Sequence, residues 1–160
     1  MSAGRSNVAL ADETARVIAA ILMRYETYGR YIKYPGDWGE RAFRGWLVYE
    51  LFHAVLGWPI PSIVFGEQFD VLFVNERIMP VIYLETKKPH RGLADEDDFI
   101  KRTPSFPTIQ YALLTDGHEW LRRDIIKGGR VEIKPESKTA DWDQFLRPIK
   151  ASDYWYEVKV

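Results

Sequence analysis

An aspartate and a Glu-x-Lys sequence on two neighbouring apolar segments are the residues of this chain best suited to chemistry. Asp70 lies near the start of the segment 69–74, and Glu85 and Lys87 end the segment 81–87. Both segments are rich in β-branched and aromatic residues, as strands are. Side chains alternate along a strand, so Glu85 and Lys87 are expected to share one face of the second strand.

The connection between these two segments is short, which favours an antiparallel hairpin. If Val74 pairs with Val81, the same register places Asp70 opposite Glu85, with Cβ atoms roughly 4.5–5.5 Å apart. Two carboxylates at that separation repel each other, and a divalent cation between them would convert the repulsion into a binding site. Lys87 could then hold an attacking water or stabilise a phosphate. The pattern indicates metal-dependent phosphodiester cleavage, against the alternative of a solvated strand face with a surface salt bridge.

Further carboxylates could complete such a site. A helix is expected over about 38–56, and Glu40 falls within its apolar stripe. An acid on the buried face of a helix needs a partner, which makes Glu40 the first candidate. The spacing from Asp37, the expected N-cap, equally fits a capping box in which Glu40 only bonds back to the Asp37 amide. Glu50 and Glu67 are the remaining alternatives.

Two basic clusters could contact a nucleic acid. Lys88 and Arg91 directly follow the Glu-x-Lys sequence, and Arg122 and Arg123 form a second cluster beside Trp120. Phosphate contacts from these residues would make binding dependent on salt. The alternative for the first cluster is a solvated basic loop, and Trp120 is expected in the core rather than as a base-stacking platform.

Composition limits the class of protein. A length of 160 residues predicts one domain over 1–160, with residues 1–9 as a flexible tail. The net charge is −1, so any contact with nucleic acid must come from a local basic patch. The sequence has no cysteine, which excludes thiolate metal sites and fits a cytoplasmic location. It also lacks a signal peptide and any apolar run near the roughly 20 residues that span a membrane.

The remaining elements follow from periodicity and from turn residues. A first helix is expected to begin with Asp12 as its N-cap and to end at Gly29 or at the turn 34–36. Short helices are expected over 95–102 and 141–146. Further strands are expected at about 61–65, 109–115, 120–126, 130–134 and 154–160, with turns at 116–117 and 127–129.

Several weak motifs in a fixed order resemble the PD-(D/E)xK nuclease superfamily. The likeness is closest to the nuclease domain at the N-terminus of type I restriction motor subunits. Glu40 precedes a Leu-Gly-Trp sequence at 56–58, and Asp70 follows it. The run Leu-Glu-Thr-Lys-Lys-Pro at 84–89 then precedes Thr-Asp-Gly-His-Glu-Trp at 115–120. The resemblance covers roughly residues 37–125.

This resemblance implies an α/β fold with a restriction-endonuclease-like core, in which helices flank a mixed central β-sheet. It also implies Mg²⁺-dependent hydrolysis of DNA, with Mn²⁺ as a substitute. Asp70 and Glu85 would hold the metal, and the backbone carbonyl of Thr86 would be a further ligand. Glu40 would bind a second metal or orient water, and Lys87 would position the attacking water.

The sequence departs from the family pattern in two places. The helix after the Glu-x-Lys strand is short and acidic and has no Gln, and Phe69 replaces the usual proline before Asp70. Restriction-type cleavage is the first expectation, by a homodimer or within a larger restriction or repair assembly. A structure-selective nuclease of the junction-resolvase kind and a non-catalytic module that binds DNA or a partner protein are the alternatives.

Overall fold

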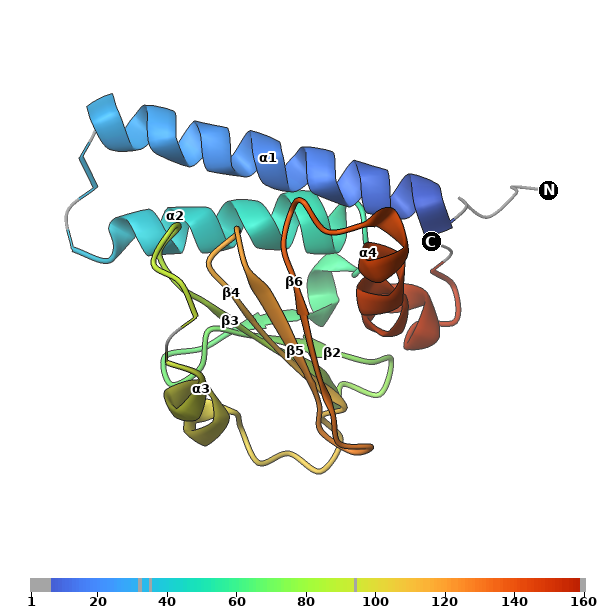
Figure 1. Cartoon of the computed structure of the whole chain (residues 1–160). Coiled ribbons are helices and arrows are strands. Elements are labelled where there is room, and N and C mark those ends of the chain that lie inside the picture. The colour runs from blue at the N-terminus through green and yellow to red at the C-terminus, as the bar shows by residue number, and fades with distance from the viewer. Residues whose placement is uncertain (1–6, 32, 35, 94, 159–160) are drawn as a thin grey trace.

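A six-stranded mixed sheet forms the centre of the protein (Figure 1). The computed structural model describes residues 7–31, 33–34, 36–93 and 95–158. The strands lie side by side in chain order, and β3 and β4 are the parallel pair while all other neighbours are antiparallel. The strands are β1 (Ile63–Phe65), β2 (Val71–Val74), β3 (Pro80–Thr86), β4 (Tyr111–Thr115), β5 (Trp120–Asp124) and β6 (Arg130–Ile133).

Helices cover both faces of this sheet, which confirms the predicted α/β class with a mixed, helix-flanked sheet. On one face α1 (Asn7–Tyr31) lies over α2 (Trp38–Trp46), which continues as the π-helical segment η1 (Leu47–His53) (Figure 1). The helix α4 (Thr139–Leu146) packs beside them, and α3 (Glu96–Arg102) joins the parallel strands across the other face. Single turns of 3₁₀-helix cover Ile60–Ser62, Arg147–Ile149 and Ala151–Asp153. Among the described residues, no helix has the length and apolar character that crossing a membrane requires.

Two apolar cores separate the sheet from its helices. The larger core lies under α1, α2 and α4, and the smaller one lies under α3. Strand β3 contributes side chains to both cores: Ile82 and Leu84 belong to the larger core and Tyr83 to the smaller. This explains the continuous apolar run of β3, which is buried on both faces. By the same alternation Glu85 points to the α3 face and Thr86 to the α2 face.

The register of β2 and β3 agrees with the prediction over three pairs and then departs from it. Val71 pairs with Leu84, and the next two residues of β2 follow the same register. Val74 pairs with Pro80 rather than with Val81, because the ladder is irregular after Phe73. The ladder ends at Val71, so Asp70 lies one residue outside it and is not a cross-strand partner of Glu85.

Helix α1 begins earlier than predicted. It starts at Asn7, so Asp12 is an exposed residue inside the helix and not its N-cap. Leu10 and Ala11 are buried in the larger core, and this burial favours extending the helix toward the N-terminus. The predicted tail over 1–9 is therefore wrong for residues 7–9, and residues 1–6 lie outside the described part of the chain.

The C-terminal segment is not the strand that its aromatic residues predicted. A 3₁₀ turn at Ala151–Asp153 and further turns replace it up to Val158, and residues 159–160 are not among those described. Trp155 donates a hydrogen bond from Nε1 to the carbonyl of Val74 at 2.9 Å. The aromatic side chains thus fasten this segment to β2 by packing and side-chain bonds instead of a strand ladder.

Candidate active site

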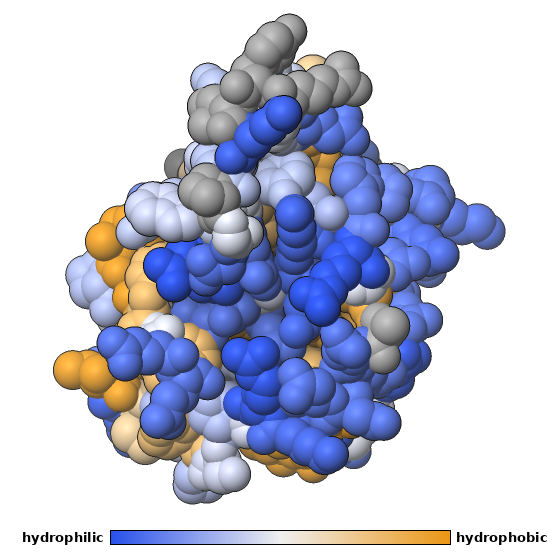
Figure 2. Space-filling view, turned by 90° about the vertical axis from the view of Figure 1, so that its left-hand side faces the viewer, coloured by the Kyte–Doolittle hydropathy of each residue, from blue (hydrophilic) through white to orange (hydrophobic). Residues whose placement is uncertain are grey.

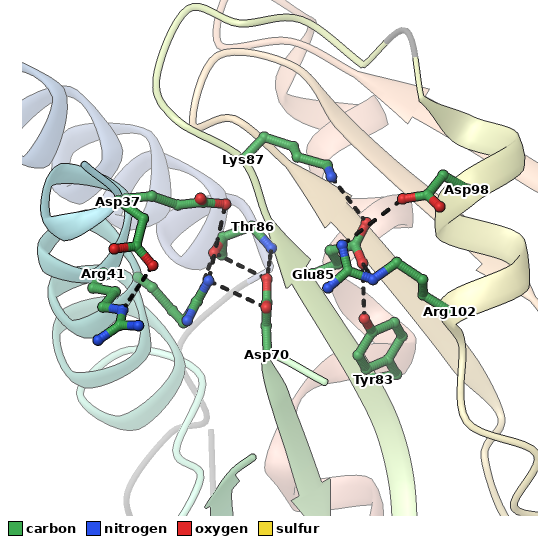
Figure 3. A network of polar contacts seen from close by, with 11 residues as sticks. Asp37, Arg41, Asp70, Tyr83, Glu85, Thr86, Lys87, Asp98 and Arg102 are labelled. Atoms are coloured by element: carbon green, nitrogen blue, oxygen red, sulfur yellow. Dashed lines mark hydrogen bonds and ion pairs between the residues drawn. The ribbon is translucent and has the colours of Figure 1, made fainter. Parts of the chain in front are cut away.

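The residues predicted to carry the chemistry lie at the carboxyl end of β3, beside the first turns of α2 and the end of α3. Figure 3 shows two neighbouring groups of polar contacts, one with Asp70 and Thr86 and the other with Glu85 and Lys87. The carboxylates of Asp70 and Glu85 are turned toward different partners. Asp70 meets Thr86 on the side of α2, whereas Glu85 meets Tyr83 and Arg102 on the side of α3 (Figure 3).

Asp70 is held on the α2 side by two groups. Its Oδ2 accepts a hydrogen bond from the backbone N–H of Thr86 at 2.8 Å, and its Oδ1 lies 3.2 Å from a guanidinium nitrogen of Arg44. The Nε of Arg44 also donates to Oγ1 of Thr86 at 2.9 Å. Asp70 is therefore fixed to the end of β3 through the backbone, although it stands outside the β2–β3 ladder.

Glu85 is a buried carboxylate, with 1 % of its surface exposed. Its Oε1 accepts a hydrogen bond from the hydroxyl of Tyr83 at 3.0 Å and lies 3.5 Å from Nε of Arg102. Its Oε2 lies 3.5 Å from Nζ of Lys87 but accepts no hydrogen bond from any described residue. A buried carboxylate oxygen without a donor is costly, so Oε2 is the atom of this site best suited to an added ligand.

Electrostatics keep two of the neighbours of Glu85, Tyr83 and Arg102, protonated. Burial, together with the Glu85 carboxylate, raises the pKa of Tyr83 above its usual range, so its hydroxyl remains a donor. Burial of the Arg102 guanidinium by itself lowers its pKa, but Glu85 and the nearby Asp70 and Asp98 outweigh this and raise it. The site thus surrounds Glu85 with donors and cations.

Glu40 lies half-buried on α2, at the edge of the same site. The capping box with Asp37 is absent, because Glu40 makes no hydrogen bond to Asp37 and the Asp37 side chain does not cap α2. Asp37 instead accepts a hydrogen bond from Nε of Arg41 at 3.0 Å. Burial raises the pKa of Glu40, opposed by Arg44, and the charge of Asp70 raises it further. The charges of Arg44 and Asp70 therefore act directly on the Glu40 carboxylate.

We expect the Glu40→Gln variant to be more stable than the wild type at pH 7 in metal-free buffer. Below the ordinary glutamate pKa of roughly 4.3, Glu40 is protonated in both the folded and unfolded chains and carries no penalty. Stability is then lost as the pH rises through the raised pKa of the folded state. Urea unfolding at pH 4 and pH 7 should show the advantage only at pH 7. An equal advantage at both pH values, or one shared by the exposed Glu136→Gln variant, would contradict this.

Sequence reasoning missed Arg44 and Arg102, the two arginines that contact the carboxylates. Each lies four residues after an acid of its own helix, since Arg44 follows Glu40 and Arg102 follows Asp98. That spacing indicates a shared helix face, so each arginine could have been placed beside its acid. Nothing in the local sequence indicated that the same guanidinium groups would also reach Asp70 and Glu85.

The predicted basic residues are divided between two environments. Lys88 and Arg91 are exposed on the segment that follows β3, next to the site, and Arg91 lies 3.9 Å from Asp95. Arg123 is half-exposed on β5. Arg122 is buried, and it donates to Asp124 and to the carbonyls of Gln144 and Phe145. Because its guanidinium is committed to these contacts, we leave Arg122 out of any nucleic-acid surface.

Asp116, in the Thr-Asp-Gly-His-Glu-Trp sequence at the end of β4, has a structural role. Its Oδ2 accepts a hydrogen bond from the N–H of Gly92 at 2.8 Å, and its Oδ1 accepts from the N–H groups of His118 and Glu119. Gly117 adopts φ of 88°, which favours glycine in this turn. Asp116 therefore ties the segment after β3, at Gly92, to the β4–β5 turn.

The two other acidic candidates lie outside this site. Glu50 accepts two hydrogen bonds from Arg24 of α1, at 2.5 and 2.8 Å, in an ion pair between helices. Glu67 is exposed on the segment before β2. Asp70, Glu85, Lys87 and the half-buried Glu40 are thus the predicted residues that the structure brings together.

The donor set at this site is compatible with a hard divalent cation. Carboxylate and carbonyl oxygens are the ligands that Mg²⁺ prefers, and Oε2 of Glu85, which accepts no hydrogen bond from the described residues, is such a ligand atom. Within the described ranges, no three acidic or histidine side chains form a ready metal cluster. Three of the carboxylates contact arginine side chains, Asp70 and Glu40 with Arg44 and Glu85 with Arg102.

The surface around the site is hydrophilic. Figure 2 views the side of the molecule that carries the start of α2, the segment after β3 and α3, and polar side chains cover its centre. The larger apolar areas of this face lie toward its edge. Such a surface suits a charged, hydrated ligand better than an apolar one.

Comparison of the chain with protein-family models, with curated proteins and with solved structures finds no match.

Proposed function

We propose that the protein is a Mg²⁺-dependent DNA endonuclease of the restriction type, built on a restriction-endonuclease-like core. The observation that carries this proposal is the buried end of β3. There Oε2 of Glu85 accepts no hydrogen bond from the described residues and lies 3.5 Å from the ammonium of Lys87, and Asp70 is bonded to the backbone of the next residue, Thr86. The chain order of these elements is the helix that carries Glu40, the strand after Asp70, the Glu-x-Lys strand, a helix and a further strand, which agrees with the order of the motifs behind the resemblance.

In this proposal Asp70, Glu85 and the backbone carbonyl of Thr86 hold the metal, and Glu40 lies on the α2 side to bind a second ion or to orient water. The bound cation would supply a nucleophilic water at neutral pH and would neutralise charge on the phosphate. These ligand groups lie together at one end of β3, and the packed core beneath them holds that end in place.

Lys87 is the proposed electrostatic catalyst. Its side chain has 10 % of its surface exposed, and its ammonium is the nearest cation to Oε2 of Glu85. A partly desolvated ammonium stabilises developing negative charge more strongly than a solvated one. Lys88 and Arg91, exposed beside the site, would contact the flanking phosphates of the DNA backbone.

A second candidate function is a non-catalytic module that binds DNA. It is favoured by the arginine contacts of Asp70 and Glu85, because a carboxylate neutralised by the protein itself needs no metal. In such a module Lys88, Arg91 and Arg123 would supply salt-dependent contacts to DNA without any cleavage.

The test is cleavage of supercoiled plasmid and of labelled linear duplex in Mg²⁺ or Mn²⁺, with an EDTA control and the Glu85→Gln variant. The nuclease proposal expects nicking or linearisation that EDTA abolishes. The Glu85→Gln variant should lose at least about 100-fold in rate, because a metal ligand contributes several kcal/mol to the transition state. Variant and wild type should unfold at similar temperatures by circular dichroism, so that lost cleavage is not lost folding.

Two results would contradict the nuclease proposal. One is an intact plasmid together with a flat calorimetric titration of Mn²⁺; salt-dependent DNA binding under those conditions would favour the binding module. The other is cleavage by the Glu85→Gln variant at the wild-type rate, which would place the chemistry elsewhere.

A further inference from the structure

Arg44 stands where positive charge is needed on the α2 side of the proposed metal site. Its guanidinium lies 3.2 Å from Oδ1 of Asp70 and 3.9 Å from Oε1 of Glu40. Its Nε donates to Oγ1 of Thr86 at 2.9 Å. Three oxygen atoms from α2, from the residue before β2 and from the end of β3 thus converge on one cation.

The surroundings of Arg44 differ from those of an ordinary surface ion pair. The Arg44 side chain has 18 % of its surface exposed, whereas Arg41, on the same helix, pairs with Asp37 while 63 % of its side chain is exposed. Exposed pairs contribute little because water and salt screen them. The contacts of Arg44 are partly desolvated, so its removal leaves Asp70 and Glu40 as half-buried charges with less compensation.

We propose that Arg44 is an internal counter-ion that neutralises Asp70 and Glu40 in the metal-free protein and competes with the divalent cation for Oδ1 of Asp70. This inference rests on the proposed function, because it assigns the cation to the same carboxylates. Arg44 is a positioning residue in this role. Arg44 holds Asp70 and Glu40 together in the metal-free protein. It releases Oδ1 of Asp70 when the metal binds.

The geometry allows this exchange without moving Asp70. Oδ2 is tied to the Thr86 N–H at 2.8 Å, so the carboxylate stays attached to the end of β3 when Oδ1 loses Arg44. Glu40 and Oγ1 of Thr86 remain as acceptors for the displaced guanidinium on the α2 side. A guanidinium stays charged at all working pH values, so the competition is set by position and not by titration.

The test is a calorimetric titration of MnCl₂ into wild type, Arg44→Met and Arg41→Met, without DNA. We expect Arg44→Met to bind Mn²⁺ at least about 5-fold more tightly than wild type, within the usual range of coupling between sites. The matched control Arg41→Met also removes an arginine–carboxylate pair from α2, and its affinity should equal that of wild type. Arg44→Gln keeps a neutral donor and should also bind more tightly, and it replaces Arg44→Met if that variant fails to fold by circular dichroism.

Unchanged or weaker Mn²⁺ binding in a folded Arg44 variant would overturn the inference. A plasmid assay on the same wild-type preparation separates this result from a failure of the proposed function. Cleavage by wild type together with unchanged affinity in the Arg44 variant removes the inference alone. No Mn²⁺ binding by any variant and no cleavage by wild type would remove the metal site and the inference with it.

Discussion

Replacing Lys87 with alanine is expected to lower the rate of DNA cleavage by at least about 100-fold, the usual cost of removing one preorganised electrostatic group. The Lys87 ammonium lies 3.5 Å from Oε2 of Glu85 and is largely shielded from water. Because this charge is fixed before the reaction, it can stabilise the phosphate without reorganisation of solvent. The rate should be measured under single-turnover conditions on linear duplex, with DNA affinity measured alongside.

Two further variants distinguish loss of the Lys87 ammonium from misfolding and from a general loss of positive charge. Lys87→Met keeps most of the apolar stem of the buried side chain and should lose as much activity as Lys87→Ala. Lys134 pairs with Glu119 at 3.6 Å, its side chain is 57 % exposed, and it has no role in the proposed site, so Lys134→Ala should cleave like wild type. Wild-type rates in both Lys87 variants would remove Lys87 from the proposed chemistry.

Replacing Trp58 with alanine is expected to lower the free energy of unfolding by about 3–5 kcal/mol. The Trp58 ring is fully buried and lies with ring centroids 5.1 Å from Phe73 of β2 and 5.4 Å from Tyr154. Its Nε1 donates to the carbonyl of Ile149 at 3.0 Å. Trp58 therefore joins the end of the π-helical segment to the sheet and to the C-terminal turns, and its truncation leaves a large cavity. Chemical denaturation monitored by circular dichroism measures the change.

Two further variants separate the packing of Trp58 from its hydrogen bond. Trp58→Phe keeps most of the ring packing but leaves the Ile149 carbonyl without its donor, so it should cost about 1–3 kcal/mol. Trp38 is 61 % exposed at the start of α2, and Trp38→Ala should change stability by less than about 0.5 kcal/mol. Equal losses in the buried and exposed tryptophan variants would be inconsistent with the packing described here.

The strands next to the site follow closely from the sequence, because their signals are local. The sequence predicts a strand over 81–87, and β3 runs from Pro80 to Thr86; the β5–β6 hairpin closes at the predicted glycines. Turn residues and alternation act over a few positions, so one sequence suffices to place them. The segment 154–160 had the same local signals. Its described residues, 154–158, join no ladder, because Trp155 bonds to the carbonyl of Val74 through its side chain.

The sequence by itself determined which groups stand at the end of β3, because Glu85 and Lys87 follow an apolar run that must be buried and their spacing sets their common face. It placed Asp70 inside the neighbouring strand, whereas β2 begins at Val71 and Asp70 lies just before it. The tertiary structure alone decided what these groups contact. Arg44 meets Thr86 across 42 positions of the chain, and Arg102 reaches Glu85 from the crossover helix. Those contacts depend on how α2 and α3 pack on the two faces of the sheet, which no local pattern encodes.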